Sequence, residues 1–164
     1  MDDKLLEELF RKYYRGAVLY CMALCGNEQL AQDIAADAFV KAYLSLPDEV
    51  PSFRYWLLRV CKNLWLDHLR RRRHEEPERM MDYIADERTP EQTYLIQECH
   101  QTLWKQIQKL PSEDRELVVL HYFSGISFQE IAAMTRKSYP AVRQRMTRLR
   151  QKLRQEMEEQ GYGR

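Results

Sequence analysis

Residues 127–154 read SFQEIAAMTRKSYPAVRQRMTRLRQKLR and contain the clearest structural pattern in the chain. Ser127 and Glu130 have the spacing of a capping box, in which a hydroxyl and a carboxylate satisfy the free amides at a helix start. A short helix is therefore predicted directly after Ser127. Ser138 is a good N-cap for a second helix, and Pro140 suits its first turn, where the amides have no helical partner. The stretch predicts two helices joined by a tight turn.

The second of these helices is predicted from about Tyr139 to Met157 and has two different sides. Between Arg136 and Arg154, eight residues are basic and none is acidic. A capped turn followed by a helix of one charge sign is typical of a DNA-reading helix-turn-helix, although a solvated basic face on a core helix is the alternative. One side is a narrow apolar stripe at helical spacing, suited to packing: Val142, Met146, Leu149 and Leu153.

The polar side chains of this helix are expected to make two kinds of DNA contact. Base edges in the major groove specify the sequence, whereas phosphates fix affinity and register. Polar residues opposite the apolar stripe are expected to read bases, and the arginines on its flanks, which also include Arg150 and Arg154, to reach phosphates. The predicted DNA-binding set is Ser138, Tyr139, Arg143, Gln144, Arg145, Thr147 and Arg148.

The composition favours an all-α fold. The chain has 164 residues, enough for one ordinary domain or two small ones, and only 5 Gly and 6 Pro. Its net charge is +1, but residues 1–74 carry +2, residues 75–100 carry −6 and residues 101–164 carry +5. We expect no metal and no cofactor, because the cysteines and histidines lack paired ligand spacing. Cys21 and Cys25 could share a metal, but two core thiols are the simpler interpretation.

The N-terminus does not resemble a targeting segment. Asp2, Asp3, Glu7 and Glu8 stand where a signal peptide would be basic. The chain also lacks a run of about 18 apolar residues, the length that a membrane span needs. We expect a soluble, cytoplasmic protein without membrane insertion.

Three long helices are predicted before the acidic middle of the chain. The first covers residues 4–25 and ends at Gly26, a residue suited to the left-handed position after a helix. The second runs from Glu28, capped by Asn27, to about Leu46, and the third runs from Phe53, capped by Ser52, to about His74. A polar, proline-rich loop from Ser45 to Ser52 separates the last two. Together they predict one compact unit, residues 1–74.

Residues 75–88 predict an acidic, flexible linker, because their helical periodicity fails. Thr89 then provides an N-cap for a helix that extends to about Leu110. A further helix is predicted from Glu113 to Phe123, before the helix-turn-helix. The expected domains are therefore two small helical units, residues 1–74 and 89–164, joined by the linker 75–88.

Three stretches carry a resemblance to a known family: Ala31–Tyr43, Phe53–Arg73 and Leu110–Glu116, followed by the helix-turn-helix. In this order and spacing they resemble bacterial extracytoplasmic-function (ECF, group IV) RNA polymerase sigma factors over nearly the whole chain. The resemblance implies that the first unit binds core RNA polymerase and melts the promoter −10 element, while the second binds the −35 element. It implies that the acidic linker threads into the polymerase, although a solubilising tether explains its charge nearly as well. It also implies an anti-sigma factor as a partner.

The resemblance assigns sites in the first unit. The Ser45–Ser52 loop is similar to the family's base-capturing loop, and Trp65 is expected to be sandwiched in the core. Polymerase binding falls on Asp33, Asp37, Phe39 and Lys41. The polar arcs of the third helix provide hydrogen-bonding edges and a positive track for exposed −10 DNA: Lys62, Asn63, Asp67, Arg70 and Arg71.

The chain departs from the family pattern at two places. Ala36-Asp37 stands where the family commonly has Gln-Glu, so one polar contact to polymerase is absent or replaced. Arg136-Lys137 replaces a frequent glycine and apolar residue in the turn. Arg136 is therefore expected to need a positive φ, at a cost of ~1 kcal/mol.

Two other classes of protein are the alternatives to a sigma factor. A stand-alone helix-turn-helix regulator would bind a duplex without polymerase, usually as a symmetric dimer. An enzyme would need a site, but the four histidines are scattered and neither a phosphate loop nor a nucleophile motif is present. We expect no catalytic residue.

Overall fold

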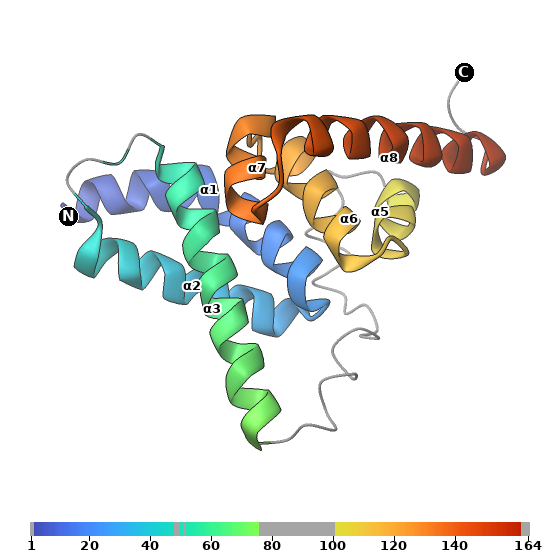
Figure 1. The fold of residues 1–164 in the computed structure, drawn as a ribbon. Coiled ribbons are helices and arrows are strands. Elements are labelled where there is room, and N and C mark those ends of the chain that lie inside the picture. The colour runs from blue at the N-terminus through green and yellow to red at the C-terminus, as the bar shows by residue number, and fades with distance from the viewer. Residues whose placement is uncertain (1, 48–49, 51, 76–100, 162–164) are drawn as a thin grey trace. The chain divides into compact units, whose positions relative to one another are not determined.

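The computed structural model describes residues 2–47, 50, 52–75 and 101–161, and every regular element among them is helical. These residues belong to two compact units that divide between Thr89 and Pro90 (Figure 1). The predicted linker and the cap at Thr89 lie outside the described residues, apart from Glu75, which ends a helix. None of the described helices combines the length and apolarity needed to cross a membrane.

The first unit contains α1 (Asp3–Cys25), α2 (Glu28–Ser45) and α3 (Phe53–Glu75), each within one residue of the bounds predicted from the sequence. Gly26 ends α1 with a φ of 71°. The Asn27 side chain accepts a hydrogen bond from the Leu30 amide at 2.9 Å. The Ser52 hydroxyl accepts one from the Tyr55 amide at 3.2 Å. Local capping chemistry therefore sets these helix ends.

The three helices pack against one another, and α3 crosses α1 and α2 (Figure 1). Small side chains on α2 allow the helices to approach closely, because Ala31, Ala35, Ala38 and Ala42 are fully buried. Trp65 is buried, as expected, but Leu66 beside it is exposed. An aromatic cluster closes one end of the core: Phe10, Tyr13, Tyr14, Phe39, Phe53 and Trp56.

The second unit contains α5 (Gln101–Gln108), α6 (Ser112–Val118), η2 (Val119–Phe123), α7 (Phe128–Thr135) and α8 (Tyr139–Glu159). The span predicted as one helix from Glu113 to Phe123 is helical throughout, but its second half is a π-helical turn and not an α-helix. There the Ser124 amide donates to the Val119 carbonyl, five residues back, at 3.0 Å. This wider turn leaves Leu120 in the core and Tyr122 exposed.

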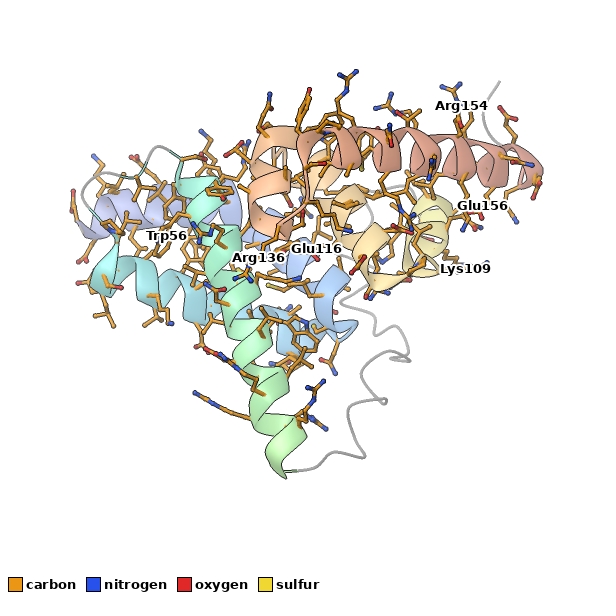
Figure 2. The ribbon with its side chains drawn as sticks, viewed as in Figure 1. Trp56, Lys109, Glu116, Arg136, Arg154 and Glu156 are labelled. Carbon is orange, nitrogen blue, oxygen red and sulfur yellow. The ribbon has the colours of Figure 1, made fainter. Side chains whose placement is uncertain are left out.

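The predicted helix-turn-helix is confirmed as α7, a tight turn and α8. Ser127 and Glu130 form both bonds of the capping box, and the Ser138 hydroxyl accepts the Ala141 amide at 3.2 Å. Arg136 has the expected positive φ, 58°, where α7 ends (Figure 2). The apolar stripe of α8 is buried as predicted: Val142, Met146, Leu149 and Leu153.

Candidate nucleic-acid interface

The outer surface of α8 is polar and exposed along its length. Arg143, Gln144, Thr147 and Arg148 are exposed there, opposite the buried stripe. Figure 2 shows Arg154 projecting outward near the far end of the helix. We call α8 the recognition helix, because it is anchored on one side and offers hydrogen-bonding and basic groups on the other.

The first turns of the recognition helix are internally ordered. The Arg143 guanidinium lies over the Tyr139 ring, 5.7 Å from its centroid. The Thr147 hydroxyl donates to the Arg143 carbonyl at 3.0 Å, so its proton is already used within the helix and its oxygen can act as an acceptor. Tyr139, Arg143 and Thr147, three residues of the predicted DNA-binding set, thus contact one another within the recognition helix.

Arg145 differs from its neighbours, because it forms an ion pair within the unit. Its Nε donates to Asp114 Oδ1 at 2.6 Å and its Nη2 to Oδ2 at 2.8 Å, the two-pronged geometry that guanidinium and carboxylate favour. The Asp114 side chain is 7% exposed and that of Arg145 48%. The hydrogen bonds and charge of Asp114 raise the pKa of Arg145. Arg145 therefore ties the recognition helix to α6.

A second ion pair joins α6 to the turn of the helix-turn-helix. Lys137 Nζ lies 3.3 Å from Glu113 Oε2, next to the Asp114 pair. Two consecutive carboxylates on α6 thus contact the turn and the recognition helix. The sequence reasoning missed both contacts, although Glu113 and Asp114 lie in the stretch that carries the family resemblance.

Tyr122 is a further residue that sequence reasoning missed. Arg150 Nε donates to its hydroxyl at 2.8 Å, and the guanidinium lies 5.9 Å from its ring centroid. The π-helical turn that exposes Tyr122 has no clear sequence signal, since its residues have ordinary helical spacing. Arg150, expected to reach phosphate, therefore already has one partner.

In the first unit, the predicted −10 residues lie along α3. Asn63, Arg70 and Arg71 are exposed, and Lys62 and Asp67 are half-buried. Asp67 forms an ion pair with Arg70 one turn away. The helix therefore combines an amide, a carboxylate and basic side chains on its accessible surface.

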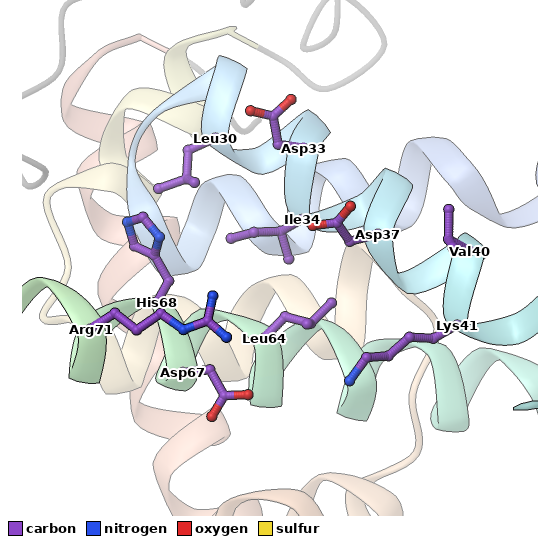
Figure 3. Close-up of a pocket in the computed structure, with 10 residues that line it drawn as sticks. All are labelled: Leu30, Asp33, Ile34, Asp37, Val40, Lys41, Leu64, Asp67, His68 and Arg71. Atoms are coloured by element: carbon purple, nitrogen blue, oxygen red, sulfur yellow. The ribbon is translucent and has the colours of Figure 1, made fainter. Parts of the chain in front are cut away.

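A cavity of about 420 Å³ with mixed polar and apolar walls lies between α2 and α3 (Figure 3), and we call it the polar cavity after the charged side chains that line it. The α2 side contributes three residues of the predicted polymerase set, Asp33, Asp37 and Lys41, and the α3 side contributes Asp67 and Arg71 from the predicted −10 set. The fold thus brings together two sets that the sequence reasoning treated as separate.

His68 also lines this cavity. Burial lowers the pKa of His68, and the positive charges of Arg72 and Arg71 lower it further. Its ring stacks on Trp65 with centroids 5.8 Å apart. His68 therefore favours its neutral form despite the nearby carboxylates.

Phe39 does not fit its predicted role as a polymerase contact. Only 4% of the residue is exposed, and its ring packs between Phe10 and Phe53 at centroid distances of 5.1 and 6.0 Å. The physical reason is that α1 and α3 both direct aromatic rings at this side of α2. Phe39 mainly holds α2 in place, although it also lines a hollow between α1 and α2.

The cysteines of the first unit are core thiols. Cys21, Cys25 and Cys61 are buried, and a hydrogen bond to Cys61, followed by burial, raises the pKa of Cys21. Within the described part of the chain, no three His, Cys, Asp or Glu side chains are grouped to hold a metal ion.

Comparisons with known proteins agree with this two-part arrangement. The model of sigma-70 region 2 matches residues 9–75, and that of sigma-70 region 4 matches residues 100–153. The ECF RNA polymerase sigma factor SigE of Mycolicibacterium smegmatis is 33% identical over 153 residues, which cover 90% of this chain and 60% of SigE. The ECF RNA polymerase sigma factor SigW of Bacillus subtilis is 29% identical, with 84% of this chain and 80% of SigW covered.

Two solved structures share the fold. The sigma factor RpoE from Bartonella quintana, in complex with the anti-sigma factor NepR, superposes with a TM-score of 0.70 at 19% identity, covering 93% of this chain and 96% of RpoE. CnrH, in complex with the cytosolic domain of CnrY, gives a TM-score of 0.58 at 26% identity, covering 93% and 86%. Because the two region models match consecutive parts of the chain and both relatives named above are ECF sigma factors, this chain belongs to the ECF family of RNA polymerase sigma factors.

Proposed function

We propose that the chain directs core RNA polymerase to promoters, with its second unit reading the −35 element. The observation that supports this most strongly is the recognition helix. Its buried stripe fixes it in the unit, while Gln144, Thr147 and Arg148 are exposed on the other side. The major groove of B-DNA admits one α-helix and displays a distinct pattern for each base pair. Gln144 and Arg148 would read base edges, and Arg143 would contact phosphate.

The first unit would read and open the −10 element through α3. A base pulled from a duplex needs a hydrogen-bonding pocket and a positive track for the backbone. Asn63 and Asp67 offer the hydrogen-bonding groups, and Lys62, Arg70 and Arg71 provide the positive charge.

Core polymerase would bind α2 through Asp33, Asp37 and Lys41, which share one side of the helix at the polar cavity. Phe39 would support this surface from the core. The two similar solved structures are complexes with anti-sigma partners, and we propose an anti-sigma factor for this chain as well. The chain would act in the cytoplasm with the polymerase, which performs the chemistry, so it needs no catalytic residue or cofactor of its own.

Transcription from a defined start site tests the proposal. Purified chain added to core polymerase should direct initiation from one promoter, and neither component should do so alone. Tight binding of the free chain to a specific duplex as a dimer, without an effect on core polymerase, would instead identify a stand-alone regulator.

Promoter opening tests the assignment of α3. The double variant Asn63→Ala with Asp67→Ala should keep promoter occupancy by holoenzyme but lose permanganate-reactive thymines around −10, and a pre-melted template should restore transcription. Leu66→Ala, an exposed position on the same helix, is the matched control. A lowered melting temperature with no rescue by the pre-melted template would show that both side chains only brace the helix.

A further inference from the structure

A tyrosine and an arginine that lie 28 residues apart in sequence meet at the surface of the second unit. Tyr122 belongs to η2 and is 48% exposed, and Arg150 belongs to the recognition helix and is exposed as well. Arg150 Nε donates to the Tyr122 hydroxyl at 2.8 Å, and the guanidinium also lies over the Tyr122 ring. We call these two residues the Tyr–Arg pair.

The backbone is irregular where it carries the tyrosine of this pair. A π-helical turn is rare and frequently occurs at a functional site. Here it buries Val119 and Leu120 in the core while Tyr122, three and two residues later, remains at the surface. The unusual turn and the exposed aromatic ring therefore coincide at the Tyr–Arg pair.

Tyr122 is also connected to the first helix of the helix-turn-helix. The edge of its ring meets the ring of His121 at a centroid distance of 4.9 Å, and His121 stacks on Phe128 at 4.4 Å. His121 Nδ1 lies 3.0 Å from the Ile126 carbonyl oxygen, which holds the imidazole in place. Because Phe128 is the first residue of α7, the position of Arg150 is coupled to both helices of the motif.

The Tyr–Arg pair leaves the arginine free to bind an anion. A guanidinium has five N–H donors, and Nε supplies only one of them. Among the described residues, the two Nη nitrogens of Arg150 have no hydrogen-bond partner. A tyrosine hydroxyl is neutral, so it orients Arg150 without neutralising its charge, in contrast to the carboxylate of Asp114 that pairs with Arg145. The Tyr122 hydroxyl accepts from Nε and keeps its own proton to donate.

Arg150 stands farther along the recognition helix than the predicted base-reading residues. It lies seven residues after Arg143 and shares a side of the helix with it. At 1.5 Å per residue, this spacing is roughly 10 Å along the helix axis. The N-terminal residues of a recognition helix contact base edges, so a side chain two turns later lies nearer the phosphates that border the groove.

We propose that Tyr122 positions Arg150 to bind one phosphate at the border of the −35 element, and that the Tyr122 hydroxyl donates its proton to the same phosphate. This rests on the proposed function, which places the recognition helix in the major groove. Arginine binds phosphate with two parallel N–H groups, and holding the guanidinium before DNA arrives lowers the cost of ordering a long side chain. A phosphate contact of this kind fixes the register of the helix on the duplex.

The test uses holoenzyme assembled from core polymerase and the full chain, bound to promoter duplexes that each carry one uncharged methylphosphonate in the −35 region. One modification should weaken binding of the native holoenzyme about tenfold, the size typical of a hydrogen bond to a charged group. Arg150→Ala should bind this modified duplex and the unmodified duplex equally well. Tyr122→Phe, which keeps the ring and removes the hydroxyl, should weaken binding to the unmodified duplex about threefold to tenfold.

Two further variants separate the Tyr–Arg pair from general charge and from stability. Lys152→Ala removes an exposed basic residue from a different side of the same helix and should keep the native sensitivity to the modified phosphate. Tyr122→Phe combined with Arg150→Ala should bind no more weakly than Arg150→Ala alone, because the hydroxyl acts through the arginine. Thermal melting of each variant checks its fold.

Three outcomes would overturn the inference. Arg150→Ala could remain as sensitive to every modified phosphate as the native chain, or Tyr122→Phe could bind like the native chain. Lower melting temperatures with an unchanged phosphate pattern would mean that the Tyr–Arg pair only braces the unit. In each case, promoter binding by the native holoenzyme would still support the proposed function. If the native holoenzyme does not occupy the promoter at all, the proposed function fails and the inference fails with it.

Discussion

Replacing Arg145 with alanine should destabilise the second unit but leave the salt dependence of DNA binding nearly unchanged. A phosphate contact, as its place on the recognition helix suggests, would produce the opposite pattern. Both prongs of the Arg145 guanidinium instead contact Asp114 of α6, at 2.6 and 2.8 Å. We therefore expect Arg145 to position the recognition helix.

The size of the destabilisation follows from the exposure of the two partners. Removing one member of a fully buried ion pair costs roughly 3–5 kcal/mol, whereas an exposed pair contributes about 0–1 kcal/mol. Asp114 is buried, but the Arg145 side chain is 48% exposed, so water can enter the gap and solvate the carboxylate. We expect a loss of about 1–2 kcal/mol, which for a unit of this size lowers Tm by roughly 5–15 °C.

The assay compares binding of the full chain to a −35 duplex over a range of salt concentrations. Each phosphate contact contributes about 0.9 to the slope of log affinity against log salt. Arg143→Ala, the control, should reduce the slope by about that amount. Arg145→Ala and Asp114→Ala should each lower affinity with the slope retained, and their effects should not add, because they remove the same contact.

The opposite pattern would refute this reasoning. If Arg145→Ala flattens the salt dependence as much as Arg143→Ala does, and Asp114→Ala binds like the native chain, Arg145 contacts phosphate and its ion pair is incidental.

Three other predictions concern single positions. Arg136→Gly should raise the unfolding free energy of the second unit by about 1 kcal/mol, because glycine adopts a positive φ without strain; a lower Tm would contradict this. Gln144→Ala and Arg148→Ala should each relax preference at one −35 position by ~1–3 kcal/mol in binding-site selection, and a uniform loss at all positions would mean that charge alone holds the helix. His68 has a lowered pKa in the fold, so the unfolded chain binds its proton more readily. The first unit should therefore lose stability as pH falls below about 6.5, and His68→Gln should reduce this loss in urea unfolding followed at several pH values; an unchanged pH dependence would assign it to other groups.

The helix ends were predictable because their chemistry is local. Ser127 needs only Glu130, three residues later, and Asn27 needs only the Leu30 amide. The positive φ of Arg136 was expected from the family resemblance, because the family frequently has glycine at this place in the turn. The buried stripe of the recognition helix was predictable for the same reason as the helix ends, because its apolar residues recur at helical spacing within one helix.

Burial on a helix with apolar residues on several sides was harder to predict. Phe39 has apolar neighbours in sequence, such as Val40, and either could face the surface. The structure buries Phe39 and exposes 54% of Val40, because rings from α1 and α3 converge only on Phe39. Whether Phe39 or Val40 is buried depends on how the three helices pack together. The spacing of apolar residues within α2 carries no information about that packing.

The contacts that modify the predicted sites also join distant parts of the sequence. Arg145 and Asp114 are 31 residues apart, and periodicity could place Arg145 on a flank of its helix but could not show that a carboxylate faces it. The polar cavity follows the same rule, since it places Asp33 and Asp37 of α2 on the same cavity as Arg71 of α3. A basic partner group bound to these carboxylates would lie on the same cavity as Asp67 and Arg71 of the predicted −10 set. Substitutions at Asp33 or Asp37 should therefore change promoter opening as well as polymerase binding, a coupling that two separate residue sets would not show.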